Sequence, residues 1–238
     1  MLLDLSEVEL SKNDLKREIK LPRIFTLELA EDVGFHIGDG YMKKVKDNFG
    51  VHYKFEYAGD FRKDLSYFEN VLIPRKKLLF NLDKIKVKNF KLNNLSFRFH
   101  SKGLYLFYKD VLKVKESPKK DIDIPKWIFK SLGFQKAFLR GIMDSDGCFR
   151  TVKKNYPLID ATSQSKGLIR DLGLILNNLK IPFSSYYVKR FDKRTDKIYT
   201  QYRVQISGRN NVPKFMKLVG FNNLKHIQRY NEREMGLA

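Results

Sequence analysis

The feature that most constrains the fold of this 238-residue chain is a repeated segment that contains glycine and ends in Asp-Gly. The first copy reads GFHIGDG over residues 34–40, and the second reads GIMDSDG over residues 141–147. The acids near the ends of the two copies, Asp39 and Asp146, are 107 positions apart (146 minus 39). A fixed spacing between similar segments indicates two structural units in tandem.

In both copies the sequence predicts a helix that ends at the acid. Thr26 is a suitable N-cap for a helix that begins near Leu27, and Gly40 is a suitable residue to end it. Strand-like residues at 41–57 and at 148–164 follow the two acids and predict a β-hairpin in each unit. The fold class is therefore α+β, with two halves of similar order.

The chain divides into a lead-in, two halves and a linker. The predicted boundaries are a polar helical lead-in at 1–23, a first half at 24–114, a linker at 115–125 and a second half at 126–238. The linker KESPKKDIDIP is rich in charge and proline. A helix after the first hairpin is expected from about residue 60 to 72, ending before Pro74, and Trp127 is expected to anchor a short helix after the linker.

The composition indicates a folded protein with a polyanionic partner. Hydrophobic residues make up 42%, while 47 Lys and Arg against 27 Asp and Glu give a net charge of +20. The basic residues alternate with Tyr and Phe in strand-like runs, which favours nucleic acid over a membrane surface. There is no apolar run of the roughly 18 residues needed to span a bilayer, and the N-terminal residues are too acidic and polar for a targeting peptide. We therefore expect a cytoplasmic protein.

The cysteine and histidine content limits the kind of metal site. Cys148 is the only cysteine, and the four histidines show no ligand spacing, so a disulfide within the chain and a thiolate-rich zinc site are excluded. Any metal must be bound by oxygen ligands.

Small residues on the two predicted helices indicate that these helices touch. Gly34 and Gly38 are four positions apart and share one helix face, and Gly141 and Ser145 repeat this face in the second half. Two small faces allow backbone-to-backbone contact, which would bring the acids at the helix ends together.

Two carboxylates at the negative ends of helices repel each other unless a cation lies between them. Oxygen ligands at a paired site suit Mg²⁺. In a strongly basic protein, such a site indicates phosphodiester hydrolysis, in which the metals activate water and stabilise the attacking and leaving oxygens.

Two motifs carry a resemblance to a known family. The segments LAEDVGFHIGDG (29–40) and FLRGIMDSDG (138–147) resemble the motif of LAGLIDADG homing endonucleases, in the monomeric form with two motifs. The resemblance extends over residues 22–230. It implies two pseudo-symmetric αββαββα halves, motif helices at their interface, and a saddle of antiparallel β-sheets over double-stranded DNA.

The resemblance also implies the residues of the site. Asp39 and Asp146 would be the catalytic acids and metal ligands, assisted by the backbone carbonyls of Gly38 and Ser145. The metal would be Mg²⁺, with Mn²⁺ as a substitute and Ca²⁺ binding without cleavage. The other catalytic residues would be Lys119, with Lys120 as an alternative, Lys225 and Gln164.

Two departures from the family pattern accompany this assignment. The second motif has Asp144 where the first has Ile37, and this earlier acid is not expected to bind metal. Gln164 has Tyr57 as its partner at the same spacing, so the groups that organise water would differ between the halves.

Alternation along the strands predicts the DNA contacts. The expected DNA-binding residues are Lys43, His52, Lys54, Arg98, Arg150, Lys154, Arg190, Arg194 and Arg203. The aromatic residues Tyr53, Phe55, Phe97 and Phe99 alternate with the basic ones and are expected in the core. His36 is expected to be a packing residue.

The predicted function is that of a monomeric, Mg²⁺-dependent endonuclease that cuts double-stranded DNA at a long asymmetric site. The alternatives are an RNA-splicing maturase, with intron RNA as partner, and a DNA-binding protein on the same fold that does not cleave. We do not expect an intein, because the chain starts at Met1 and ends in EREMGLA, without the residues of splicing. Intron-encoded and free-standing forms both stay open.

Overall fold

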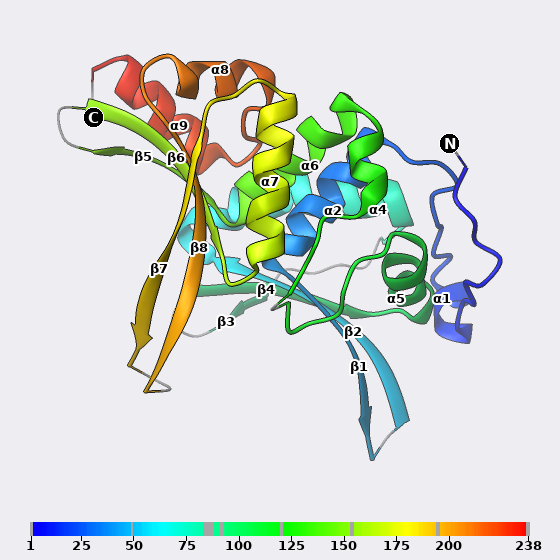
Figure 1. The fold of residues 1–238 in the computed structure, drawn as a ribbon. Helices are drawn as coiled ribbons and strands as arrows, with labels where there is room; N and C mark the ends of the chain where they lie inside the picture. The colour runs from blue at the N-terminus through cyan, green and yellow to red at the C-terminus, as the bar shows by residue number, and fades with distance from the viewer. Residues whose placement is uncertain are drawn as a thin grey trace.

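A computed structural model describes most of the chain. The described residues are 2–48, 50–82, 88–90, 93–119, 121–152, 155–193 and 196–236, with only the backbone at 88–90. Two halves, each with helices over one face of a sheet, meet through two central helices (Figure 1). The predicted fold class is confirmed.

The first half follows the order αββαββα. Its elements are α2 (Leu27–Asp39), β1 (Gly40–Asp47), β2 (Gly50–Asp60), α3 (Phe61–Tyr67), a π-helical turn (Phe68–Leu72), α4 (Ile73–Phe80), β3 (Lys88–Phe90), β4 (Asn94–His100), α5 (Lys102–Leu106) and a second π-helical turn (Phe107–Val111). Thr26 caps α2 as predicted, since its side chain accepts a hydrogen bond from the Leu29 amide.

The second half repeats this order. Its elements are a 3₁₀ helix (Lys126–Lys130), α6 (Leu132–Ser145), β5 (Gly147–Val152), β6 (Tyr156–Ser163), α7 (Lys166–Asn178), β7 (Ser184–Asp192), β8 (Lys197–Ser207), α8 (Asn211–Leu218) and α9 (Leu224–Glu234). Trp127 does anchor the short helix, because its ring lies 4.5 Å from that of Phe25 and its Nε1 donates to the Leu112 carbonyl at 3.3 Å.

Both sheets are antiparallel and share one topology. The strand orders are β1-β2-β4-β3 and β5-β6-β8-β7. In Figure 1 the hairpins β1–β2 and β7–β8 extend away from the helices on opposite sides and frame a saddle-shaped surface. None of the described helices is long and apolar enough to cross a membrane.

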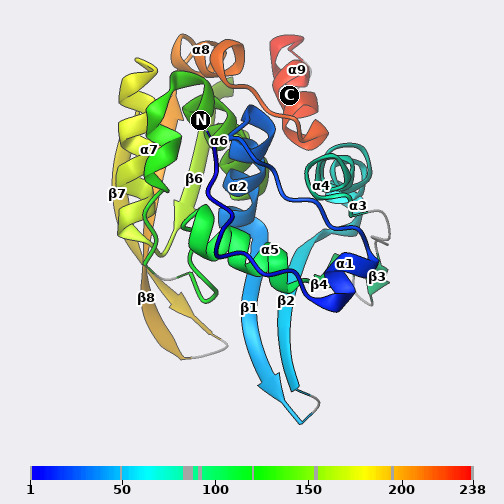
Figure 2. The ribbon, with the colours of Figure 1, turned by 90° about the vertical axis from the view of Figure 1, so that its right-hand side faces the viewer.

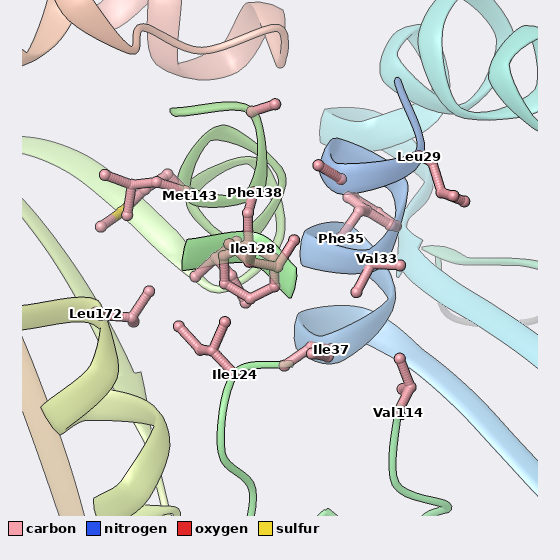
Figure 3. Packing of buried hydrophobic residues seen from close by; sticks show 14 of the residues in the cluster. Leu29, Val33, Phe35, Ile37, Val114, Ile124, Ile128, Phe138, Met143 and Leu172 are labelled. Carbon is pink, nitrogen blue, oxygen red and sulfur yellow. The ribbon is translucent and has the colours of Figure 1, made fainter. Parts of the chain in front are cut away.

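The central helices touch through their small residues, as the sequence predicts. A Cβ added at Gly34 would lie 2.2 Å from the Phe138 carbonyl oxygen, and one at Gly141 would lie 2.1 Å from that of Glu31. The helices therefore pack at backbone distance. Apolar side chains such as Phe35 and Phe138 are buried around this contact (Figure 3).

Pro74 does not end the helix that contains it, contrary to the sequence prediction. The chain makes a π-helical turn first, and the Ile73 amide bonds to the carbonyl of Phe68, five residues back. Pro74 then occupies the first turn of α4, where a missing N–H is tolerated.

The lead-in is less helical than the sequence predicts. Only α1 (Lys12–Lys16) is helical, and the neighbouring segments run irregularly along the first half. The helix is short because Glu18 adopts a left-handed conformation, with φ of 53°, directly after the C-cap residue Arg17.

Candidate functional site

The two predicted acids lie at the ends of the packed helices. Asp39 is the last residue of α2, and Asp146 is the C-cap of α6. A Cβ added at Gly38 would lie 3.4 Å from Asp146 Oδ2, so the second acid reaches the last turn of the first helix. The helix contact thus brings an acid of each half to a common place.

The surroundings disfavour the charged form of both acids. Burial and then the charge of Asp146 raise the pKa of Asp39 to about 7, against the opposing effects of Lys225 and Lys119. Burial raises the pKa of Asp146 to about 6, and Lys119 opposes this shift. Solvent still reaches both residues at the helix ends, so a cation can reach them too.

Lys119 joins the site from the linker. Its Nζ donates to the carbonyl oxygens of His36, Ile37 and Gly38, at 2.7, 2.7 and 3.0 Å. These are the last carbonyls of α2, where the helix dipole favours a positive charge. Burial lowers the pKa of Lys119 to about 8, while Asp146 and Asp39 act in the opposite direction. The alternative, Lys120, lies outside the described residues.

The linker is held on both sides of Lys119. The Ser117 amide donates to the Met42 carbonyl of β1 at 2.9 Å. Further along, the Ile122 amide donates to Ser165 Oγ and the Ile124 amide donates to Asp171 Oδ2, both at 2.9 Å. Attachment to both halves fixes the lysine at their junction.

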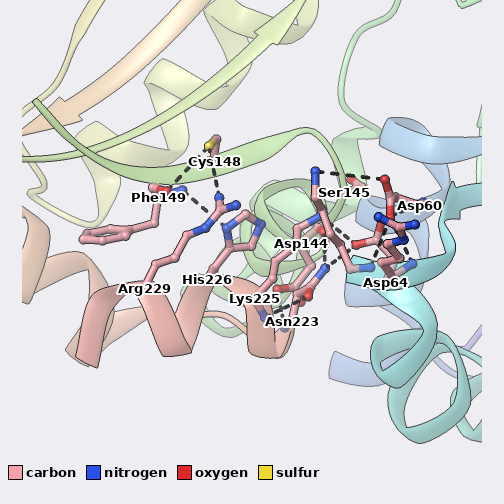
Figure 4. A network of polar contacts seen from close by, with 12 residues as sticks. Asp60, Asp64, Asp144, Ser145, Cys148, Phe149, Asn223, Lys225, His226 and Arg229 are labelled. Atoms are coloured by element: carbon pink, nitrogen blue, oxygen red, sulfur yellow. Dashed lines mark hydrogen bonds and ion pairs between the residues drawn. The ribbon is translucent and has the colours of Figure 1, made fainter. Parts of the chain in front are cut away.

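Lys225 approaches the site from α9 but is held differently. Its Nζ donates to Asp64 Oδ1 at 2.7 Å, which joins α9 of the second half to α3 of the first (Figure 4). Asn223 Nδ2 donates to the same oxygen at 3.3 Å. Asp64 could not be assigned to the site from the sequence, because nothing local in the chain predicts a contact 161 residues away.

Asp144 has a structural role in the loop before α9. It is buried, and its Oδ1 accepts hydrogen bonds from the Asn222 and Asn223 amides, both at 2.9 Å. Burial raises its pKa to about 7. This carboxylate anchors the loop that leads into α9 (Figure 4).

The predicted pairing of Gln164 with Tyr57 is wrong. Gly40 pairs with Tyr57, whereas Gly147 pairs with Ala161, so the structural counterpart of Tyr57 is Ala161. The two hairpins differ in length, and this shifts the correspondence by three residues. Gln164 itself is exposed and directly follows β6.

Tyr57 instead belongs to a buried polar network in the first half. Lys76 Nζ donates to Asp32 Oδ2 at 2.9 Å, to the Tyr57 hydroxyl at 2.7 Å and to the Tyr108 hydroxyl at 2.9 Å. His36 Nδ1 lies 2.7 Å from the Tyr57 hydroxyl. Lys76 is 1% exposed and Asp32 is fully buried. His36 is also fully buried, and its ring contacts those of Phe55 and Tyr108, so it packs in the interior as predicted while it joins this network.

Among the described residues of the second half, the places that match Asp32 and His36 carry no such network. Its central helix carries the buried residues Leu139 and Met143 where α2 carries Asp32 and His36. The buried network surrounds the last turns of α2, whose carbonyls hold Lys119. Polar groups therefore position the helix end in the first half, whereas apolar packing does so in the second.

The predicted DNA-binding residues within the described chain share the polar face of each sheet. In the first sheet Lys43 pairs with Lys54, and Glu56 pairs with Arg98. In the second sheet Arg203 pairs with Tyr186 on the same face as Arg190. The opposite face buries Phe55 and Phe97, as expected of the aromatic set, and Tyr53 and Phe99 pack partly against the core. Lys154 and Arg194 lie outside the described residues.

Each sheet also carries an acid among these basic residues. Glu56 lies 2.8 Å from Lys54 and 2.6 Å from Arg98, and Asp160 lies 2.8 Å from Arg150 and 3.1 Å from Arg203. His52 lies 3.1 Å from Asp47. These pairs hold long side chains in place on the face.

Comparisons with known proteins agree with this architecture. Residues 133–220 match a family model described as LAGLIDADG-like domain. No curated protein matches the chain in sequence. Among solved structures, I-DmoI in complex with DNA and Ca superposes with a TM-score of 0.58 at 20% identity, covering 81% of this chain and 88% of that one.

Two further structures superpose over more of the chain. The I-SmaMI LAGLIDADG homing endonuclease bound to cleaved DNA has a TM-score of 0.54 at 12% identity, covering 92% of this chain and 91% of that one. The homing endonuclease I-WcaI bound to its DNA recognition sequence has a TM-score of 0.54 at 18% identity, covering 92% of both chains. The predicted resemblance is confirmed: the chain has the fold of single-chain LAGLIDADG homing endonucleases, and its second half contains a LAGLIDADG-like domain.

Proposed function

We propose that this protein is a site-specific endonuclease that hydrolyses both strands of a DNA duplex with the help of divalent metal ions. The observation that carries the proposal is the meeting of Asp39 and Asp146 at the ends of two packed helices, next to Lys119. A protein that only binds DNA has no use for two acids that repel each other and the phosphates.

The residues present fit Mg²⁺. The donors at the helix ends are the carboxylates of Asp39 and Asp146 and the backbone carbonyls of Gly38 and Ser145, all oxygen ligands. The described part of the chain has no group of three or more His, Cys, Asp or Glu that could hold a metal, so other ligands would be water and DNA phosphate oxygens. Bound Mg²⁺ would supply an activated water and stabilisation of charge on the reacting oxygens. We expect Mn²⁺ to substitute and Ca²⁺ to bind without cleavage.

The other groups would assist in distinct ways. Lys119, fixed by three carbonyls, would place a positive charge near the scissile phosphate and stabilise negative charge as it develops. Lys225 would do the same in the second half, held by Asp64. Gln164, exposed after β6, would orient water by hydrogen bonding.

The protein would bind the duplex as a monomer, through the saddle formed by its two sheets. The basic residues on the polar faces of the sheets would contact phosphates and base edges. Because the two halves belong to one chain and differ in sequence, the recognised site has no need of two-fold symmetry. Solved structures of the same fold, described as I-DmoI in complex with DNA and Mn and as I-SmaMI bound to cleaved DNA, support this proposal.

A cleavage selection from a randomised duplex library in Mg²⁺ tests the proposal. We expect a single asymmetric sequence to be enriched among cut molecules. An RNA-splicing maturase or a non-cleaving DNA-binding protein would instead bind without cutting, and binding of intron RNA and of duplex at matched salt would separate these two.

A further inference from the structure

A basic groove lies beside the first sheet, where the N-terminal segment crosses the end of β4. Its volume is about 530 Å³. Figure 2 shows α1 next to the β2–β4 part of the sheet. The lysine, arginine and histidine residues that line the groove are Lys16 of α1, its C-cap residue Arg17, His52 of β2, His100 of β4 and Lys102 of α5.

Buried contacts fix α1 against this end of the sheet. Asp14 is fully buried and accepts hydrogen bonds from the Ser11 amide at 3.0 Å and from the Gly103 amide at 3.1 Å. Arg17 donates to the His100 carbonyl. A Cβ at Gly103 would collide with the Leu10 side chain, so the chain segments are in close contact. The basic residues of α1 are therefore held in place beside the sheet.

The charges around the groove favour an anion. No acid is among the described residues that line the groove, whereas two lysines, an arginine and two histidines are. Asp14, Glu9 and Asp47 pair with Arg17, Lys102 and His52 from outside this lining. Burial, and then the charges of His52, Lys54 and Arg17, lower the pKa of His100. Positive groups that line a groove with no acid among its described residues attract a phosphate.

The groove is continuous with the predicted DNA-binding face. The rings of His52 and His100 are 5.7 Å apart, and along their strands they are followed on the same face by Lys54 and Arg98. After the end of β4, the Ser101 amide donates a hydrogen bond to the Tyr53 carbonyl of β2 at 3.0 Å. Beyond it the edge of β2 faces the groove rather than another strand. A polyanion lying along the sheet would meet the groove at its end.

We propose that the segment around α1 is a second DNA-binding element, which contacts backbone phosphates of the duplex on the flank outside the first sheet. This inference rests on the proposed binding of a duplex to the saddle. Because lysine, arginine and histidine would contact phosphates and not base edges, the contact adds affinity without sequence preference. It extends the bound length of DNA on the side of the first half only.

The test compares the full chain with a triple variant, Lys16→Gln, Arg17→Gln and Lys102→Gln. The probe is a duplex of about 40 base pairs that carries at its centre a target selected by binding in Ca²⁺ buffer, and affinity for this duplex is measured against salt. Each lost phosphate contact lowers the slope of log K against log salt by about 0.9, so we expect a loss of about 2 to 3. A hydroxyl-radical footprint should shorten on the first-half side alone.

The matched control removes the same charge from the helix side of the molecule, with Lys63→Gln, Lys77→Gln and Lys126→Gln. This control variant should show the wild-type slope of log K against log salt, and its footprint on the duplex should keep the full length. Thermal unfolding reports that each variant is folded, whether or not the protein cuts DNA.

If the triple variant has the wild-type salt slope and footprint, the inference is wrong. That result would not contradict the proposed cleavage of DNA. A shortened footprint in a protein that never cuts would support the inference and contradict the proposed enzymatic function. The two failures are therefore distinguishable.

Discussion

Gly34 of α2 and Phe138 of α6 are in backbone contact, since a Cβ on the glycine would lie 2.2 Å from the Phe138 carbonyl oxygen. A carbonyl in a helix cannot move away without disturbing the helix. The position of the two acids at the helix ends therefore depends on glycine at this place.

Replacing Gly34 by Ala should destabilise the protein by about 1–3 kcal/mol, because the added methyl group forces the helices apart. Gly133→Ala is the matched control, since its Cβ would meet side chains and no backbone, Leu27 at 3.2 Å and Ser131 Oγ at 3.7 Å. Gly133 is the second residue of α6, so its replacement should change stability by less than the roughly 1 kcal/mol that separates Gly from Ala in a helix interior. Thermal unfolding of both variants measures the difference. A Gly34→Ala protein as stable as wild type would contradict the backbone contact between α2 and α6 at Gly34.

The buried ion pair of the first half predicts a large effect of Lys76→Met. The substitution leaves Asp32 buried without its cation and should cost about 3–5 kcal/mol. The neighbouring exposed Lys77→Met should change stability by less than about 0.5 kcal/mol. Adding Asp32→Leu, the residue type found at the matching place of the second half, should recover part of the loss. Equal urea midpoints for the two lysine variants would contradict the network.

The raised pKa of Asp39 predicts a dependence of stability on pH in the absence of metal. An acid with a raised pKa keeps its proton to higher pH in the folded state, so its contribution favours folding at low pH. This contribution is lost as the pH rises from about 4 to about 7. The lowered pKa values of His36 and His226 act in the opposite direction, but they are common to wild type and variant.

The measurement is therefore the difference in melting temperature between Asp39→Asn and wild type in EDTA. Asparagine does not titrate, so the advantage of the variant should increase from pH 5 to pH 8. A difference that stays constant over this range would mean that the Asp39 pKa is not raised.

Lys119 should be needed for cleavage but not for tight binding of DNA. Lys119→Met removes a charge held at the end of α2 and should lower the rate of cleavage by about 100-fold or more, in keeping with the loss of one electrostatic catalytic group. Lys115→Met is the control within the same linker, because Lys115 is exposed and its Nζ donates to the Asp121 carbonyl, away from the last turn of α2. Single-turnover cleavage with equal loss in both variants would assign Lys119 a general electrostatic role instead.

The parts of the fold that local patterns specify could be predicted from the sequence. The repeated glycines predicted the helix contact, and alternation predicted which face of each strand is polar. The Tyr57 position could not be predicted, because a difference in hairpin length shifts the pairing and is not visible at constant spacing.

Contacts between distant residues were also missed. Lys76 is 44 positions from Asp32, and Lys225 is 161 positions from Asp64. In so basic a chain, the sequence does not distinguish a buried lysine from the many exposed ones. The helix through Pro74 was missed for a different reason, since a π-helical turn precedes Pro74 and leaves it in the first turn of α4, where its missing N–H is tolerated.

The central claim is that Asp39 and Asp146 act together in metal-dependent cleavage, and the most direct measurement is the cleavage rate of their Asn variants on the selected duplex in Mg²⁺. Each substitution keeps the shape of the side chain and removes a charge that the metals need, so the rate should fall by roughly 1000-fold or more. Affinity for the duplex in Ca²⁺ and the melting temperature should be retained or rise, because one repulsive charge is gone. Cleavage by either variant at the wild-type rate would contradict the account.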